Sequence, residues 1–567
     1  MRLIRCVGMI LILFFLASPL SSGSQEKIYW GDEVPEKWNG LWPEKFQTIP
    51  EKTDYKKTTS SYEVLEFIDL LKWNSENLHV FTMFISELQR QCPVVVMSNP
   101  RITSPQEARK SGKPVIYLQG NIHPPEAEGK EALLMVMRDI LLGDKKHLLE
   151  DQIILCCPNF NVDGNDTWGL RDGTPHIIGT RQNARGYDLN RDAIKLETTN
   201  VQELYRTVLN RWDPVLVFDA HAMGRVQHGY AIVYATSTVP AAHPGPRGYV
   251  WDTLFPAMRT AIRENFQIET FSHCLFPRNQ WPPKVWSHDL AYWTTEGKFV
   301  TAAYGLRNRM SILVETPGDP SFERKIYAHK ALITELLEYT NLHGKEMREI
   351  CLRADQEVIE EIQTQAASGD LKNFLAGKYE SRGLIDLLAY PENLYEYIPG
   401  TSVQRPRSGT IDGPPQVIKG VEHLTKSVGT REATVPRGYL IPEDLDHIVD
   451  KLRLQNIEIK NLKEPITVKG EEFVIDAIKT VQRSGYAMTD LEGEFVRFES
   501  KTFPAGTYMI DLAQPLANLA FYCLEPEVGD GLAGWGFFNE TLQSLLNEKE
   551  KVVFPVVKYF EIVEDSP

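Results

Sequence analysis

The chain has 567 residues, of which 42% are hydrophobic and 10% aromatic, so it carries enough apolar material for at least one large core and is not a disordered protein. Its formal net charge of −15 argues against a nucleic acid as partner, because polyanions are bound by clustered Lys and Arg side chains.

The first 24 residues have the pattern of a signal peptide. Arg2 and Arg5 precede an apolar stretch from about Cys6 to Ala17, and small residues near position 24 offer a cleavage site. The apolar stretch is too short for a typical membrane span, and an uncleaved anchor is the alternative. We therefore expect an exported protein, periplasmic or extracellular, with no stable membrane span after signal cleavage.

Between Pro114 and Thr316, short apolar runs alternate with helical patterns, which is typical of a sheet covered by helices. The runs at 114–119, 153–157, 215–219 and 311–315 are continuous rather than alternating, as expected for strands buried on both faces. The segment 128–143 has helical apolar spacing and should pack on the sheet. These patterns predict an α/β fold with a mixed, mostly parallel sheet and helices on both faces.

The rest of the chain divides into a connector and a second domain. Residues from about 322 to 367 show two helical patterns, broken near His343-Gly344, and would end a large domain spanning 25–367. Eight of the 22 positions in 399–420 are Pro or Gly, which favours an irregular linker within a connector at 368–430. Residues 431–567 are expected to form a smaller α+β or β-rich domain of unknown role.

Three chemistry-bearing motifs each end an apolar run: His123-Pro-Pro-Glu126, His221 and Glu315. Alone, a His-x-x-Glu motif or a His after a strand is more often an ordinary structural feature. Residues that end different strands of an α/β sheet can nevertheless meet in one cleft. Hydrolytic zinc takes three His or carboxylate ligands and a water, with a further carboxylate to move the proton of that water. The combination predicts a catalytic site with one Zn²⁺ per chain.

The segment between these motifs carries a family resemblance. Residues 186–191, Gly-Tyr-Asp-Leu-Asn-Arg, resemble the Gly-x-Asp-x-Asn-Arg signature of the zinc carboxypeptidase family, and the order His-x-x-Glu, Arg, Asn-Arg, His, Glu is that of the family. The resemblance covers roughly residues 50 to 345, which would make 25–367 the catalytic domain. The C-terminal part resembles the extension of some large exported bacterial members.

The resemblance implies a role for each matching residue. The zinc ligands would be His123, Glu126 and His221, and Glu315 would act first as general base and then as general acid. In the substrate cleft, Arg181 would stabilise the oxyanion, Asn190 and Arg191 would hold a substrate carboxylate, and Asp188 would orient the ring of His123.

The sequence departs from the family pattern at the active-site Tyr, which has two candidates. Tyr304 is preferred over Tyr292 as the catalytic Tyr. Arg307 and Arg309 are additional cations near the expected site, and we expect Arg307 to contribute to substrate binding.

These observations favour an exported zinc metallopeptidase of carboxypeptidase type, with peptides, proteins and cell-wall peptides as its candidate substrates. The alternative is a zinc-dependent amidohydrolase of the aspartoacylase type, which shares the metal pattern but acts on N-acyl amino acids. A non-catalytic binding protein is disfavoured because Glu315 is present.

Overall fold

The computed structural model describes residues 27–563 except for short gaps at 172, 278–279, 292, 392–394, 398–403, 407–412, 484 and 549–550. The expected signal peptide at 1–24 and the candidate Tyr292 therefore lie outside the described residues. Among the helices within these bounds, none has the length and hydropathy needed to cross a membrane.

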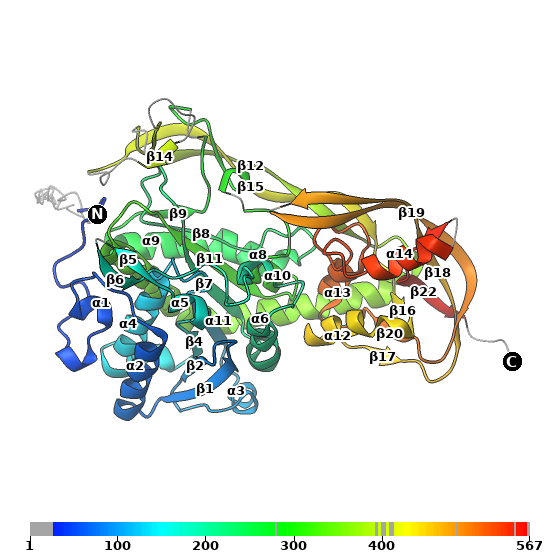
Figure 1. Ribbon diagram of the computed structural model, residues 1–567, viewed down its shortest axis with the longest axis horizontal. Helices are drawn as coiled ribbons and strands as arrows, with labels where there is room; N and C mark the ends of the chain where they lie inside the picture. The colour runs from blue at the N-terminus through cyan, green and yellow to red at the C-terminus, as the bar shows by residue number, and fades with distance from the viewer. Residues whose placement is uncertain are drawn as a thin grey trace, which may run out of the picture.

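An eight-stranded sheet forms the centre of the larger domain (Figure 1). Its strands lie in the order β1-β2-β4-β3-β7-β11-β8-β9. Their bounds are β1 Leu78–Ile85, β2 Gln91–Met97, β3 Val115–Gly120, β4 Ile153–Cys157, β7 Leu216–Ala222, β8 Ile232–Ala235, β9 Thr270–Ser272 and β11 Met310–Thr316. The four neighbours β4, β3, β7 and β11 are parallel, whereas β1, β2 and β8 join antiparallel neighbours. The predicted mixed, mostly parallel α/β sheet is confirmed.

Helices cover both faces of this sheet, which explains why its central strands are apolar throughout. One face packs against α2 (Ser61–Asn74), α4 (Glu128–Leu142), α9 (Phe255–Phe266) and α11 (Phe322–Gln365). The other face packs against α6 (Thr199–Glu203), α10 (Val300–Gly305) and part of the C-terminal domain. Shorter helices lie around them: α1 Ile49–Lys52, α3 Pro105–Ser111, α5 Val162–Asn165, α7 Asn210–Trp212 and α8 Pro244–Tyr249.

The helix α11 is continuous over 44 residues, so the predicted break near His343-Gly344 is wrong. Gly344 instead lets the helix approach the start of β3 closely. A Cβ atom at this position would lie 2.6 Å from Cγ of Pro114. The glycine therefore reflects close packing rather than a helix end.

The stretch 368–430, expected to be a connector with an irregular linker, contains two long strands instead. β12 (Lys372–Ala389) pairs antiparallel with β15 (Gln416–Thr434), and β10 (Val285–Ser287) of the larger domain pairs with β15. Buried apolar side chains fasten this ribbon, because Leu387 and Val421 pack with Trp286 in one cluster. The Pro and Gly residues lie mostly between the two strands, where part of the segment falls outside the described residues.

The C-terminal domain is built on a second sheet, in which seven strands are described. Its strands are β16 Gly438–Ile441, β17 Lys460–Asn461, β18 Ile466–Arg483, β19 Tyr486–Phe503, β20 Tyr508–Asp511, β21 Val552–Val553 and β22 Val557–Val563. Its helices are α12 Asp446–Leu454, α13 Ala517–Leu524 and α14 Asn539–Glu548. Apolar side chains of this domain belong to the same core as one face of the larger sheet, so the two domains are packed together.

Candidate active site

The carboxyl ends of three neighbouring strands bring the predicted metal ligands and Glu315 together. His123 and Glu126 lie in the turn between β3 and α4, where the Glu126 N–H donates to the His123 carbonyl oxygen at 2.8 Å. His221 is in β7 and stands opposite Glu315 of β11 in the parallel register. The sheet order β3-β7-β11 therefore places all four residues at one edge.

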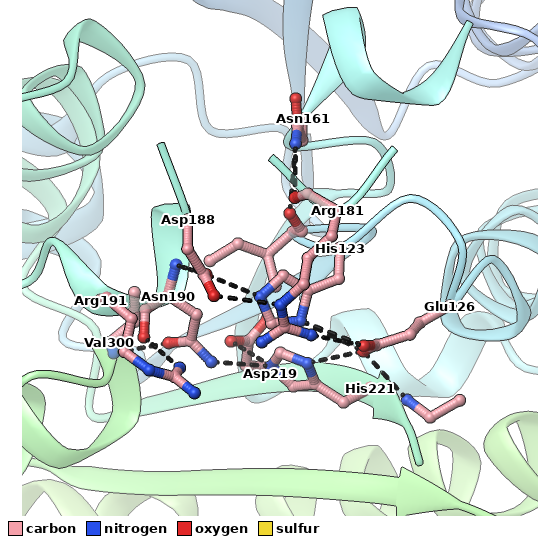
Figure 2. A network of polar contacts seen from close by, with 12 residues as sticks. His123, Glu126, Asn161, Arg181, Asp188, Asn190, Arg191, Asp219, His221 and Val300 are labelled. Atoms are coloured by element: carbon pink, nitrogen blue, oxygen red, sulfur yellow. Dashed lines mark hydrogen bonds and ion pairs between the residues drawn. The ribbon is translucent and has the colours of Figure 1, made fainter. Parts of the chain in front are cut away.

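His123, Glu126 and His221 form a group with the geometry of a metal site. One ligand atom of each lies within 4.8 Å of the other two. The Nδ1 atoms of both rings face the carboxylate, at 3.2 Å for His123 and 2.9 Å for His221 (Figure 2). In the part of the chain that is described, no other group of three such residues meets this criterion.

Two further carboxylates, those of Asp188 and Asp219, contact the two rings at the nitrogens that face away from Glu126. Nε2 of His123 lies 2.9 Å from Oδ1 of Asp188, and Nε2 of His221 lies 2.9 Å from Oδ2 of Asp219. Histidines that bind a metal through one nitrogen commonly donate from the other nitrogen to a carboxylate. Both rings are thus arranged to present Nδ1 to a cation, and the donor set of two imidazoles and a carboxylate suits zinc.

Sequence reasoning missed Asp219. Its signal was present, because residues i and i+2 of a strand lie on the same side and Asp219 precedes His221 by two positions in β7. Gln119 of the neighbouring strand β3 donates to the other oxygen of Asp219 at 3.2 Å. The carboxylate is therefore fixed from both sides.

Glu315 is the carboxylate of the site with an uncommitted oxygen. Its Oε2 atom is buried, and the described residues provide it with no hydrogen-bond partner. Burial raises the pKa of Glu315 to about 8, and the negative charges of Glu126 and Asp219 act in the same direction, against His221 and Arg181. A buried, unpartnered oxygen beside a cluster of metal ligands fits a position next to a bound water.

Arg181 connects the ligand cluster to Asp188. Its Nε donates to Oδ2 of Asp188 at 3.0 Å and its Nη1 to Oε1 of Glu126 at 3.1 Å. Burial alone would raise the pKa of Asp188, but the hydrogen bond and charge of His123, with Arg191 and Arg181, hold that pKa well below its usual range. The carboxylate therefore stays ionised, and the Arg181 side chain, 39% exposed, borders the cluster.

Asn190 contacts His221, whereas Arg191 contacts Phe299 and the backbone of Asn190. The Asn190 side chain is buried, with Nδ2 3.2 Å from Nε2 of His221 and Oδ1 accepting the Val300 N–H at 3.0 Å. The Arg191 guanidinium stacks over Phe299, 4.6 Å from the ring centre, and donates to the Asn190 carbonyl oxygen. The amide of Asn190 thus serves contacts within the protein, and the guanidinium is the better placed of the two to meet a ligand.

The structure corrects the prediction for Tyr304. This residue is fully buried in α10, and its hydroxyl donates to the carbonyl oxygen of Pro214 at 2.5 Å. Pro214 lies just before the start of β7, at the opposite end of that strand from His221. Tyr304 is therefore a packing residue, and its expected catalytic role is wrong.

The prediction for Arg307 is corrected for a similar reason. Its guanidinium is buried at the contact with the C-terminal domain, where it donates to the Gln455 carbonyl oxygen and to Oδ1 of Asn210, both at 2.8 Å. Arg309 is held by Asp213 and Asp355. The expected contribution of Arg307 to substrate binding is therefore wrong.

Comparison with known proteins places the site in a family context. Residues 64–224 match the family model described as zinc carboxypeptidase. Carboxypeptidase 2 of Trichophyton tonsurans is 25% identical over 484 residues, covering 80% of this chain and 79% of the relative. Carboxypeptidase 2 of Trichophyton rubrum is 24% identical with the same coverage. The alignment covers 80% of this chain, which is a longer stretch than residues 1–367. The aligned region therefore extends beyond the larger domain into the C-terminal part.

Solved structures also match parts of this chain, at low similarity. A putative carboxypeptidase from Burkholderia mallei matches with a TM-score of 0.36 and 17% identity, over 50% of this chain and 68% of that one. A metallo-carboxypeptidase from Pseudomonas aeruginosa matches with a TM-score of 0.34 and 16% identity, over 51% of this chain and 70% of that one.

Proposed function

This chain belongs to the zinc carboxypeptidase family and is a peptidase, and on that basis we propose that it is an exported, zinc-dependent carboxypeptidase that removes residues from the C-terminus of peptides. The observation that carries the proposal is the cluster of His123, Glu126 and His221 within 4.8 Å, next to the uncommitted oxygen of Glu315. The expected stoichiometry is one zinc ion per chain.

The proposed ligands are His123, Glu126 and His221, with Asp188 and Asp219 orienting the two rings. When bound there, zinc would supply a water whose pKa is near 7. Glu315 accepts a proton from the attacking water and returns it to the leaving amine. General acid–base catalysis of this kind typically raises the reaction rate roughly 10² to 10⁴-fold. A glutamate kept away from other hydrogen-bond donors is suited to this exchange.

Two arginines have the remaining roles, which are stabilisation of the oxyanion and binding of the substrate carboxylate. Arg181, which borders the ligand cluster, stabilises the negative charge that develops on the scissile carbonyl oxygen. Arg191 binds the terminal carboxylate of the substrate, a task for which a planar guanidinium is suited. Asn190 supports His221, which it contacts through its amide, and Arg191, which donates to its carbonyl oxygen.

The amidohydrolase alternative predicts a different substrate class. A mixed peptide library, cell-wall peptide fragments and N-acyl amino acids, each incubated with the purified protein and analysed by mass spectrometry, separate the two. We expect single C-terminal residues to be released, with the release abolished by a chelator and restored by zinc. Hydrolysis of N-acyl amino acids without turnover of any peptide would reject the carboxypeptidase proposal.

Export is supported by the basic residues and apolar stretch at the N-terminus of the sequence. Expression of the full chain followed by mass measurement of the secreted protein tests it. We expect a mature protein that begins near residue 25, and retention of the full-length chain in the cell would contradict export.

A further inference from the structure

A helix of the C-terminal domain, α13, is fixed on the larger domain. Figure 1 shows this helix at the side of its domain that faces the larger one. The carbonyl oxygen of Pro515, just before α13, accepts a hydrogen bond from Nδ2 of Asn308 at 2.8 Å. Nδ2 of Asn308 also donates to Asp355 of α11 at 3.1 Å. The start of α13 is therefore tied to the strand end and the long helix of the larger domain.

Tyr522 of α13 bonds to the backbone of the larger domain. Its hydroxyl oxygen accepts the Gly297 N–H at 2.8 Å, and both residues are buried. Because an N–H group can only donate, the proton of the hydroxyl is left for Oδ1 of Asp530, its second partner, which is also buried. The phenol therefore uses its donor and its acceptor within the protein, in a contact between the two domains.

Gly297 allows the backbone to come this close to the phenol. A Cβ atom at Gly297 would lie 2.9 Å from Cε1 of Tyr522 and 3.3 Å from Cδ1 of Leu306. A larger residue would push the chain away from the hydroxyl. The contact thus fixes the course of the backbone itself, in the segment 297–300 that leads into α10 and that we call the support segment.

The support segment carries the ring on which Arg191 lies. The Phe299 ring centre is 4.6 Å from the guanidinium carbon of Arg191. On the same ring stacks Trp293, with the ring centres 4.9 Å apart and the planes inclined by 20°. Phe299 is buried, so its position follows that of its backbone. A displacement of the support segment would therefore displace the guanidinium.

The end of the support segment bonds to a second residue of the site. The Val300 N–H donates to Oδ1 of Asn190 at 3.0 Å, and Nδ2 of Asn190 lies 3.2 Å from Nε2 of His221 (Figure 2). An unbroken series of contacts thus runs from α13 through the support segment to the candidate site.

We propose that Tyr522 is a positioning residue, which holds the support segment and through it sets the positions of Arg191 and Asn190. This inference rests on the proposed function, in which Arg191 meets the substrate. It also gives the C-terminal domain a role, because that domain then completes the candidate site from the side opposite the substrate and makes no contact with the substrate itself.

The physical basis is the cost of an unpaired buried donor. Without the hydroxyl, the Gly297 N–H would be buried with no acceptor, and the backbone would have to move to find another partner. Small displacements of groups that orient a substrate have large effects on turnover. Loss of one hydrogen bond at Tyr522 should therefore be measurable in the kinetics.

The test is Tyr522→Phe, which removes the hydroxyl and keeps the ring. We expect KM for a peptide substrate to rise about fivefold and kcat to change by less than about twofold, because a neutral hydrogen bond corresponds to a factor of roughly 2 to 10. Steady-state kinetics on the full chain measure both. An unchanged KM overturns the inference.

Tyr439→Phe is the matched control. Tyr439 is another buried tyrosine of the C-terminal domain, and its hydroxyl donates to Glu525, a buried carboxylate of the same domain. Both variants should lose similar stability in urea, whereas only Tyr522→Phe should change KM. An equal rise of KM in the two variants would show a general effect of destabilisation and overturn the inference.

A double variant tests whether Tyr522 acts through Arg191. In an Arg191→Ala background, Tyr522→Phe should change KM by less than about twofold, since the group that it positions has been removed. A rise of KM as large as that in the parent background would mean that Tyr522 acts by another route, contrary to the inference.

Hydrogen exchange measured by mass spectrometry makes the inference testable without turnover. Exchange of the backbone amides in 295–301 should be about tenfold faster in Tyr522→Phe than in the parent protein, and unchanged in Tyr439→Phe. Equal exchange in the parent and Tyr522→Phe overturns the inference, even where the parent releases C-terminal residues. A parent protein without peptide turnover would instead reject the proposed function, while the exchange rates still decide whether Tyr522 holds the support segment.

Discussion

Asp219 and His221 lie two residues apart on β7, and Oδ2 of the aspartate is 2.9 Å from the ring nitrogen of His221 that faces away from Glu126. Outer carboxylates of this kind typically contribute 10 to 100-fold to metal affinity. We expect Asp219→Asn to lose zinc about 10 to 100-fold more readily and to regain activity when zinc is added in excess. Zinc content after dialysis against graded chelator concentrations measures this.

The control for that experiment is Asp192→Asn. Asp192 is a buried carboxylate that accepts hydrogen bonds from the Glu197 and Thr198 N–H groups and contacts neither imidazole. It should lower stability and leave zinc affinity unchanged. Equal zinc retention by Asp219→Asn and the parent protein would show that the contact does not support the metal.

The role proposed for Glu315 predicts that metal binding and turnover can be separated. Glu315→Gln should retain zinc and lose at least 10²-fold in kcat, because the amide cannot accept the proton of the attacking water. Metal analysis and peptide turnover on the same sample measure both properties. Glu335→Gln is the control, since Glu335 is another largely buried glutamate but lies in α11 and bonds to Asn265. Turnover at the wild-type rate in Glu315→Gln would remove Glu315 from the mechanism.

Close packing of α4 on β7 predicts that a substitution at Gly129 destabilises the protein. A Cβ atom at Gly129 would lie 2.3 Å from Cβ of Ala220, which precedes His221 and cannot move without its strand. Gly129→Ala should therefore lower the free energy of unfolding by about 1 to 3 kcal/mol, although alanine favours helices. In Gly248→Ala, where nothing lies within 4 Å of the new methyl group, stability should be unchanged or rise. Urea unfolding of both variants measures the difference, and equal midpoints would contradict the packing argument.

The sequence was sufficient to predict that His123, Glu126 and His221 come together, because their motifs follow or end apolar runs and the ends of parallel strands meet at one edge of a sheet. It was insufficient for Tyr304 and Arg307, which belong to the short segment before β11. A shift of one position in a helical turn moves a side chain by about 100°, so the sequence could not decide between the cleft and the core. The contact of Arg307 with Gln455 was out of reach, since it depends on how two domains pack.

Buried histidines predict that stability falls in mild acid. Burial lowers the pKa of His228 to about 3 and that of His423 to about 4, whereas an unfolded chain has a histidine pKa of about 6.5. Between pH 6.5 and 4 the unfolded state binds more protons than the folded state. The free energy of unfolding should therefore be highest above pH 6.5 and decrease as the pH falls through that interval, by about 1.4 kcal/mol for each unit of pKa difference.

Urea unfolding between pH 7.5 and 4.5 measures this decrease. His423→Gln can keep the hydrogen bond to Ser272 and removes the titrating ring, so its stability should depend less on pH. His447→Gln, at an exposed position of α12, is the control and should follow the wild-type curve. An unchanged slope in His423→Gln would show that this ring does not contribute.

Arg307 should matter for domain docking rather than for substrate binding. Its guanidinium joins Asn210 of the larger domain to the Gln455 carbonyl oxygen of the C-terminal domain, and both acceptors lose their partner in Arg307→Ala. We expect the free energy of unfolding to fall by about 2 to 4 kcal/mol, because buried acceptors left without donors are costly. Under conditions in which the Arg307→Ala variant is still folded, its activity at saturating substrate should persist. Arg191→Ala should behave in the opposite way, with a higher KM for peptides that have a free carboxylate and little loss of stability. If Arg307→Ala instead raised KM selectively for free-carboxylate peptides at unchanged stability, the guanidinium would have to reach the cleft, and the correction of its role would be wrong.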